Sequence, residues 1–336
     1  MPILQVYRDT IQREDSGDVM NEPGAHDLQQ IEQALLADDP QFTAQFRRAT
    51  EQLGSAVTDV PPGPIVVAVD GTLTSMQAVH WAAMRARTSD ADIRIVHAFR
   101  WRSYPLEYGM AELQDLSGQE AGQEICRSAV DLASAVAPAT RVTGTLVSGT
   151  AGPAIVQATA DAALLVLGGS RLSATKTLLS ASTVPYVIAR VRCSVAVLPS
   201  GGSAPAEPGT APSRVCVGVA GGAGDTAALA EALRIARASN HELLVVCAAG
   251  AEQATRTALA MLRRHVDVPA VEQMTAKDQV VNTLIRLAPS SQAIVCDRSH
   301  VILNSPLRGR AGRRLVHEAC CPLLLTYAAA NDLGGR

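Results

Sequence analysis

ALLVLGGSRLSATKTLLSASTVPYVIARVRCSVAVLP, residues 163–199, joins an apolar strand, a glycine loop, a helix and a second apolar strand. The same shape recurs at residues 291–326, SQAIVCDRSHVILNSPLRGRAGRRLVHEACCPLLLT. The two stretches align without a gap when Cys193 is set on Cys321. A correspondence of this length indicates an internal repeat, so the chain is expected to contain two similar halves.

Apolar runs and helical patterns alternate through both halves. This rhythm is typical of a parallel sheet with helices on its faces. Thr74 is the expected N-cap of the first core helix. The earlier strands of the two halves are expected at Ile65–Asp70, Ile93–Phe99, Val142–Val147, Val215–Val219, Leu243–Ala248, Ala270–Met274 and Ala293–Cys296.

Two stretches without this rhythm divide the chain. Residues 1–62 are polar and end at Pro61-Pro62-Gly63, while residues 201–213, GGSAPAEPGTAPS, have the composition of a linker. We therefore expect a helical N-terminal extension (1–62), a first domain (63–200), a linker (201–213) and a second domain (214–330).

The composition is that of a globular protein long enough for two domains. Of the 336 residues 47% are hydrophobic, and 29 Lys and Arg stand against 32 Asp and Glu. This balance gives no basic excess to attract nucleic acid. No apolar run is long enough to span a bilayer, and the first residues lack a secretory pattern, so we expect a cytoplasmic protein without a membrane partner.

The seven cysteines include no C-x-x-C pair, and most lie in or beside apolar runs. Buried thiols are the expected outcome. The histidines show neither metal-ligand spacing nor a Ser/His/Asp order. We therefore predict no metal site, no catalytic residues and no enzymatic activity.

Within the extension, residues 27–48 (DLQQIEQALLADDPQFTAQFRR) place Leu28, Ile31 and Leu35 on one helical stripe. The segment resembles the N-terminal part of a small actinobacterial family of unknown function, in which a similar I-E-x-x-L-x-x-D-D-P-x-F precedes membrane helices. No such helices follow here. The segment is interpreted as a docking or oligomerising element, with a flexible tail as the alternative.

The repeated stretch resembles the end of the universal stress protein (UspA) fold. ATP-binding members carry Gly-x-x-Gly-x9-Gly-[Ser/Thr] between the fourth strand and the fourth helix. The resemblance implies two adenine nucleotide alpha hydrolase-like α/β domains, each with a central parallel sheet in the order 3-2-1-4-5. The motif positions read Gly168, Arg171, Ala181 and Ser182 in the first half, and Cys296, Ser299, Gly309 and Arg310 in the second.

The tip of the first strand is the candidate nucleoside contact. Ligands of doubly wound folds bind beyond the carboxyl ends of the strands, and the resemblance implies that Asp70, with Gly71 and Thr72, contacts the adenine nucleoside. The alternative is a carboxylate held only by the dipole of the next helix. Ala220 stands at the equivalent position of the second half and offers no such side chain.

The loop after the fourth strand is the candidate phosphate contact. Gly168 and Gly169 permit close backbone approach, Ser170 and Ser182 offer hydroxyl groups, and Arg171 offers a cation. However, Arg171 replaces a family glycine, and its side chain would fill part of the pocket. The expected cofactor is therefore ATP, bound weakly and in the first half alone.

Two further features leave alternatives open. The loop at residues 100–117, RWRSYPLEYGMAELQDLS, is expected either to cover a ligand or to cover a neighbouring domain. Arg308, Arg310, Arg313 and Arg314 near the start of the last helix indicate either an anionic partner or a solvated face paired with Asp297 and Glu318.

The resemblance implies a non-catalytic regulatory protein of a stress or dormancy response. Its expected partners are an adenine nucleotide and either a protein or a second copy of the chain. The alternative is a nucleotide-free scaffold that acts through protein contacts. The halves are expected to pack through their last strands, Val195–Leu198 and Leu323–Leu325, because pairing removes an exposed apolar edge.

Overall fold

The computed structural model describes residues 63–100, 103–104, 113–114, 117–169, 180–200, 214–221, 224–252, 255–256, 259, 270–302 and 308–327. The predicted extension, residues 1–62, and the predicted linker, residues 201–213, lie outside the described residues. Both boundaries therefore stay predictions. Residues 56–336 form one compact unit.

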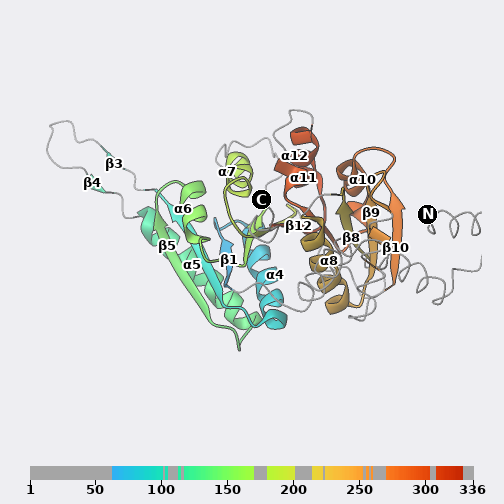
Figure 1. Cartoon of the computed structure of the whole chain (residues 1–336). Helices are drawn as coiled ribbons and strands as arrows, with labels where there is room; N and C mark the ends of the chain where they lie inside the picture. Colours follow the sequence, from blue (N-terminus) through green and yellow to red (C-terminus); the bar gives the residue numbers. More distant parts are fainter. Residues whose placement is uncertain are drawn as a thin grey trace, which may run out of the picture. The chain divides into compact units, whose positions relative to one another are not determined.

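The elements of the first half follow the predicted alternation (Figure 1). Its elements are β1 (Ile65–Ala68), α4 (Leu73–Ser89), β2 (Ile93–Phe99), β3 (Ser103–Tyr104), β4 (Leu113–Gln114), α5 (Ser117–Val136), β5 (Val142–Ser148), α6 (Ala151–Ala158), β6 (Leu164–Gly168), α7 (Ser180–Ile188) and β7 (Ser194–Leu198).

The second half repeats this order. Its elements are β8 (Arg214–Val219), α8 (Asp225–Ser239), β9 (Glu242–Cys247), β10 (Val271–Thr275), α10 (Val280–Leu287), the 3-10 turn η1 (Ala288–Ser290), β11 (Ala293–Asp297), α11 (Ser299–Ile302), α12 (Arg308–Glu318) and β12 (Leu323–Thr326). The helix expected between β9 and β10 lies mostly outside the described residues.

The main sheet confirms the predicted strand order in both halves. Its ten strands run β10-β9-β8-β11-β12-β7-β6-β1-β2-β5. Numbered within each half, this order reads 3-2-1-4-5 twice, and all pairs within a half are parallel. The central strands are apolar on both faces, as buried parallel strands must be.

The two halves join through their last strands, as predicted. Strand β12 pairs antiparallel with β7, with Leu323 opposite Val197 and Leu325 opposite Val195. The four strands β12, β7, β6 and β11 are buried along their length, apart from Ser194 and Gly168 at their ends. The antiparallel step turns two parallel sheets into one and removes two apolar edges.

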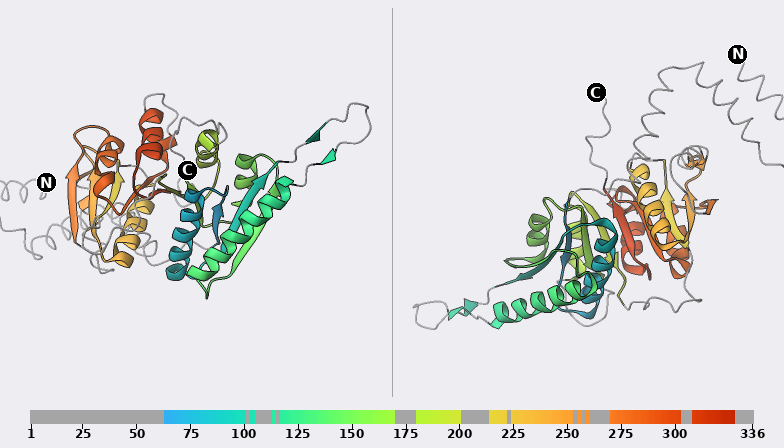
Figure 2. Two further views of the ribbon diagram at one scale, coloured as in Figure 1. Left: turned by 180° about the vertical axis from the view of Figure 1, so that it is seen from behind. Right: turned by 90° about the horizontal axis from the view of Figure 1, so that it is seen from below.

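Helices cover both faces of the sheet (Figure 2). In the first half α4 and α5 lie on one face, and α6 and α7 on the other. On the α6 and α7 face, one apolar cluster continues across the junction into the second half. It includes Val187 and Leu165 of the first half and Leu284, Ile294 and Leu315 of the second. The halves therefore share a core as well as a strand pair.

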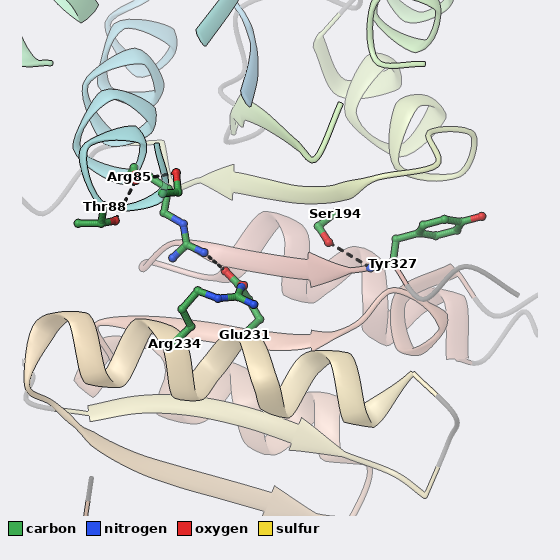
Figure 3. A network of polar contacts seen from close by, with 7 residues as sticks. Arg85, Thr88, Ser194, Glu231, Arg234 and Tyr327 are labelled. Carbon is green, nitrogen blue, oxygen red and sulfur yellow. Dashed lines mark hydrogen bonds and ion pairs between the residues drawn. The ribbon is translucent and has the colours of Figure 1, made fainter. Parts of the chain in front are cut away.

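Polar contacts add to the junction (Figure 3). Arg85 on α4 forms an ion pair with Glu231 on α8, which also pairs with Arg234 one turn along the same helix. Near the other end of the junction, the backbone N–H of Tyr327 donates to the Ser194 hydroxyl at 3.3 Å.

One local expectation, the residue that caps the first core helix, differs from the structure. Helix α4 is capped by Thr72, not Thr74, because the Thr72 hydroxyl oxygen accepts the Ser75 N–H at 3.2 Å. The helix therefore begins at Leu73.

In the aromatic loop, β3 pairs antiparallel with β4. Most other residues of this loop lie outside the described part of the chain, so the choice between covering a ligand and covering a neighbouring domain stays open.

Candidate functional site

The candidate site lies at the carboxyl end of two adjacent central strands. Strand β1 pairs directly with β6, and its C-terminal residue Ala68 lies opposite Leu167. Asp70 therefore follows β1 close to where Gly168 ends β6. Helix α4 begins directly after Asp70-Gly71-Thr72. The sheet and the helix thus bring the predicted nucleoside residue next to the first of the predicted phosphate residues.

Asp70 organises the turn into α4. One of its carboxylate oxygens, Oδ1, accepts hydrogen bonds from the Thr72 N–H at 3.0 Å and the Thr72 hydroxyl at 2.6 Å. The Thr72 oxygen in turn caps Ser75. Asp70 is exposed, and in the described part of the chain its second oxygen, Oδ2, has no hydrogen bond. The carboxylate is therefore both part of the helix cap and available to a ligand.

Gly71 and Gly168 lie where neighbouring segments approach the backbone so closely that a Cβ atom would contact them. Gly71 has φ of +81°, and a Cβ there would lie 2.9 Å from Ile125 Cδ1. A Cβ at Gly168 would lie 3.0 Å from the Ser75 nitrogen, at the start of α4. Gly71 therefore lets the turn after β1 approach α5, and Gly168 lets the end of β6 approach the N-terminus of α4.

Gly169 continues this edge. Its N–H donates to the Leu198 carbonyl at 2.6 Å, and a Cβ there would lie only 2.5 Å from the same oxygen. Any side chain would therefore force β6 and β7 apart. The sequence reasoning expected Gly169 to approach a phosphate; in the structure, its backbone N–H is used by β7.

The remaining predicted phosphate residues are only partly described. Ser170 and Arg171 lie outside the described residues. Ser182 falls in the first turn of α7, since this helix begins at Ser180. The roles of all three in ligand binding stay predictions.

The equivalent edge of the second half is built differently. Asp225, at the start of α8, occupies the place of Ser75 when Ala220 is set on Asp70. Its Oδ2 accepts the Ala220 N–H at 2.9 Å and the Gly221 N–H at 2.7 Å. In the first half the corresponding hydroxyl, Ser75 Oγ, accepts the Asp70 N–H at 3.4 Å. A full carboxylate thus replaces a neutral hydroxyl.

Two further polar side chains lie at this edge of the second half, the Asp297 carboxylate and the His300 imidazole. Asp297 ends β11 and takes the place of Gly169, while the absence of a side chain at Gly224 leaves room for its carboxylate. The Asp297 Oδ1 accepts the Ser299 N–H at 2.9 Å. His300 Nε2 lies 3.3 Å from Asp225 Oδ1. Asp225, Asp297 and His300 are all buried.

These differences change the charge at the second edge. Two buried carboxylates repel an anion, and one of them already accepts backbone N–H groups at the end of β8. The sequence pattern drew attention to Ala220 and Cys296 at this edge, whereas Asp297 was expected to pair with the arginines of the last helix and Asp225 was given no role. The repeat itself contained the signal, because it sets Asp225 on Ser75 and Asp297 on Gly169.

The cysteines confirm the expectation of buried thiols. Six of the seven are buried, and Cys320 is half-buried. Burial raises the pKa of Cys193 to about 11 and that of Cys321 to about 12. Within the described residues, no three His, Cys, Asp or Glu side chains gather as a metal site.

The arginines near the start of α12 had two alternative roles: contact with an anionic partner, or a solvated face with ion pairs of its own. The described residues bear on this choice in part. Arg314 pairs with Glu318 through two hydrogen bonds of 2.8 and 3.0 Å, as the solvated-face alternative expected. The expected partner Asp297 instead contacts the Ser299 N–H and lies against Gly224. The side chains of Arg308 and Arg310 lie outside the described part.

Comparison with known proteins gives a family match in the first half. Residues 62–199 match the model of the "Universal stress protein family". The chain is also 27% identical over 291 residues to "Universal stress protein Rv2005c" of Mycobacterium tuberculosis and to "Universal stress protein Mb2028c" of Mycobacterium bovis. Each alignment covers 78% of this chain and 96% of the relative, so it extends into the second half.

A solved structure shows the same fold. A universal stress protein from Archaeoglobus fulgidus covers 80% of this chain and 97% of its own, with 12% identity and a TM-score of 0.62. A universal stress protein solved in complex with cAMP covers 40% of this chain and 93% of its own, with 28% identity and a TM-score of 0.30. Among the described residues, no helix is both long and apolar enough to cross a membrane.

Proposed function

We propose that the chain is a tandem universal stress protein of the cytoplasm that binds one adenine nucleotide, ATP, in its first half and acts by regulatory binding rather than turnover. The family match of residues 62–199 and the repeated strand order support the tandem assignment. The N-terminal segment at residues 27–48 is proposed to dock or oligomerise.

The difference between the two strand edges carries the proposal of a single site. In the first half an exposed Asp70 stands beside Gly168, where backbone packing leaves no side chain between β6 and the α4 N-terminus. In the second half Ala220 replaces Asp70, and buried Asp225 and Asp297 bring negative charge to the edge. An anionic ligand is favoured at a helix N-terminus and disfavoured beside two buried carboxylates.

The test is ATP titration of the full chain by calorimetry. We expect one weak site in the wild type and no detectable binding in Asp70→Ala, because this variant loses the exposed carboxylate. Asp161→Ala is the matched control. It removes a second exposed carboxylate of the first half, which pairs with Arg94 at 2.8 Å and lies just before β6, at the amino end of that strand.

Two more variants separate binding from local structure. Asp70→Asn keeps an oxygen that can accept the Thr72 hydrogen bonds, so its binding loss reports on the ligand rather than on the helix cap. Ala220→Asp should not create a second site, because Asp225 and Asp297 remain. Two equivalent sites in the wild type would contradict the assignment.

A nucleotide-free scaffold is the second candidate function. The observation that favours it is the use of Asp70 Oδ1 and the Gly169 N–H in contacts within the protein. Absence of binding at millimolar ATP, together with no nucleotide released on heat denaturation, would support the scaffold instead.

A further inference from the structure

Helix α7 connects the proposed nucleotide site with the second half. Its first turn contains Ser182, a proposed phosphate contact. Just beyond its other end, the carbonyl oxygens of Ile188 and Val191 accept hydrogen bonds from Arg298 Nη1, the Ile188 bond measuring 3.3 Å. Arg298 belongs to the second half, in the turn that follows β11. One side chain of the second half therefore holds the end of a first-half helix.

Helix α7 depends on such outside support. It has nine residues and contains Pro185, which has no N–H to complete a helical hydrogen bond. Helices this short are marginal without tertiary contacts. Val187 and Ile188 are buried, and Tyr186 packs so closely on α6 that a Cβ at Gly152 would lie 2.7 Å from its ring.

Arg298 is itself held in place. Its guanidinium carbon lies 4.4 Å from the centre of the Tyr327 ring, and its backbone N–H donates to the Thr326 carbonyl at 3.0 Å. Burial lowers the pKa of Arg298 below its ordinary value. A cation beside the last carbonyls of a helix is favoured by its dipole and by the unsatisfied oxygens.

The alignment of the two halves shows which first-half residue corresponds to Arg298. Arg298 aligns with Ser170, a proposed phosphate contact of the first half. The corresponding turn of the second half lies beside Asp297, whose buried carboxylate changes the charge at this edge. In the second half, this turn instead contacts the first half through Arg298.

We infer that Arg298 is a positioning residue for the nucleotide site of the first half. By fixing the C-terminal end of α7, it sets where Ser182 in the first turn of that helix meets the phosphates, about 9 Å away along the helix. The inference rests on the proposed function, since it assigns a role at the same site.

The experiment compares ATP affinity in the full chain for the wild type, Arg298→Met and Arg190→Met. Arg190 is the matched control: it lies at the same end of α7, donates to the Tyr186 carbonyl at 3.3 Å and stacks 3.9 Å from the Tyr186 ring, entirely within the first half. We expect Arg298→Met to weaken ATP binding at least about fivefold, and Arg190→Met by less than about twofold.

A second measurement does not need ATP. Amide hydrogen exchange in α7 should be faster in Arg298→Met than in Arg190→Met, because only the first loses the contact from the other half. Arg298→Lys keeps the charge without the planar fork, so its affinity and exchange should fall between wild type and Arg298→Met. This variant also serves if Arg298→Met does not fold.

The outcomes separate the two proposals. Failure of the wild type to bind ATP would reject the proposed function, and the positioning role with it. Wild-type binding with equal affinities in the Arg298 and Arg190 variants would reject the positioning role alone. Unchanged α7 exchange in Arg298→Met and Arg298→Lys would also reject it, whatever the ATP result.

Discussion

At the carboxyl ends of the central strands, the two halves differ in single side chains more than in their helices and strands. Both turns after the first strand of each half contain a glycine with positive φ, Gly71 at +81° and Gly221 at +86°. The backbone of the turn is therefore repeated. What changes is the side chain that meets it: neutral Ser75 in the first half and charged Asp225 in the second.

We expect Asp225 to stabilise the folded second half, whereas Ser75, at the equivalent position of the first half, leaves the candidate site open. In Asp225→Ala the N–H groups of Ala220 and Gly221 lose their acceptor, and His300 loses a partner. We expect a loss of about 1–3 kcal/mol in the free energy of unfolding, measured by urea titration. Asp225→Asn is the control, because its amide oxygen can still accept both N–H groups. An Asp225→Ala variant as stable as the wild type would contradict this role.

At the scale of elements, α4 and α8 meet across the junction through a shared carboxylate. Glu231 contacts Arg85 and Arg234, and the three side chains are only 13%, 15% and 18% exposed, respectively. Burial lowers the pKa of Arg85, which is consistent with a guanidinium withdrawn from water. Removing the carboxylate would leave two neighbouring cations in a poorly hydrated place.

Glu231→Gln should therefore lower the free energy of unfolding by about 3 kcal/mol, since it breaks a largely buried ion pair. The matched control is Glu318→Gln, which breaks the Arg314 pair on the exposed side of α12, where the side chains are 57% and 44% exposed. That change should cost about 0.5 kcal/mol or less. Equal losses in thermal or urea unfolding would show that α4 and α8 do not depend on this contact.

For the whole molecule, the repeat made the sheet predictable and left the junction contacts unpredicted. The strand order was implied by the resemblance to the universal stress protein fold, and the pairing of β7 with β12 followed from the need to cover apolar edges. The contacts of Glu231 and Arg298 could not be foreseen in this way. Each depends on which side chains from distant segments meet, and hydrophobic periodicity does not specify this.

The pairing of β7 with β12 has a consequence for the halves expressed separately. In the whole chain Leu324 lies opposite Ala196 at the middle of the pair, with apolar residues on either side. A half alone exposes this edge, and an antiparallel edge can pair with its own copy. Residues 1–200 and residues 214–336 are therefore each expected to dimerise or precipitate. Analytical ultracentrifugation of each half beside the full chain measures this. Two stable monomeric halves would show that the junction is not needed to protect the edges.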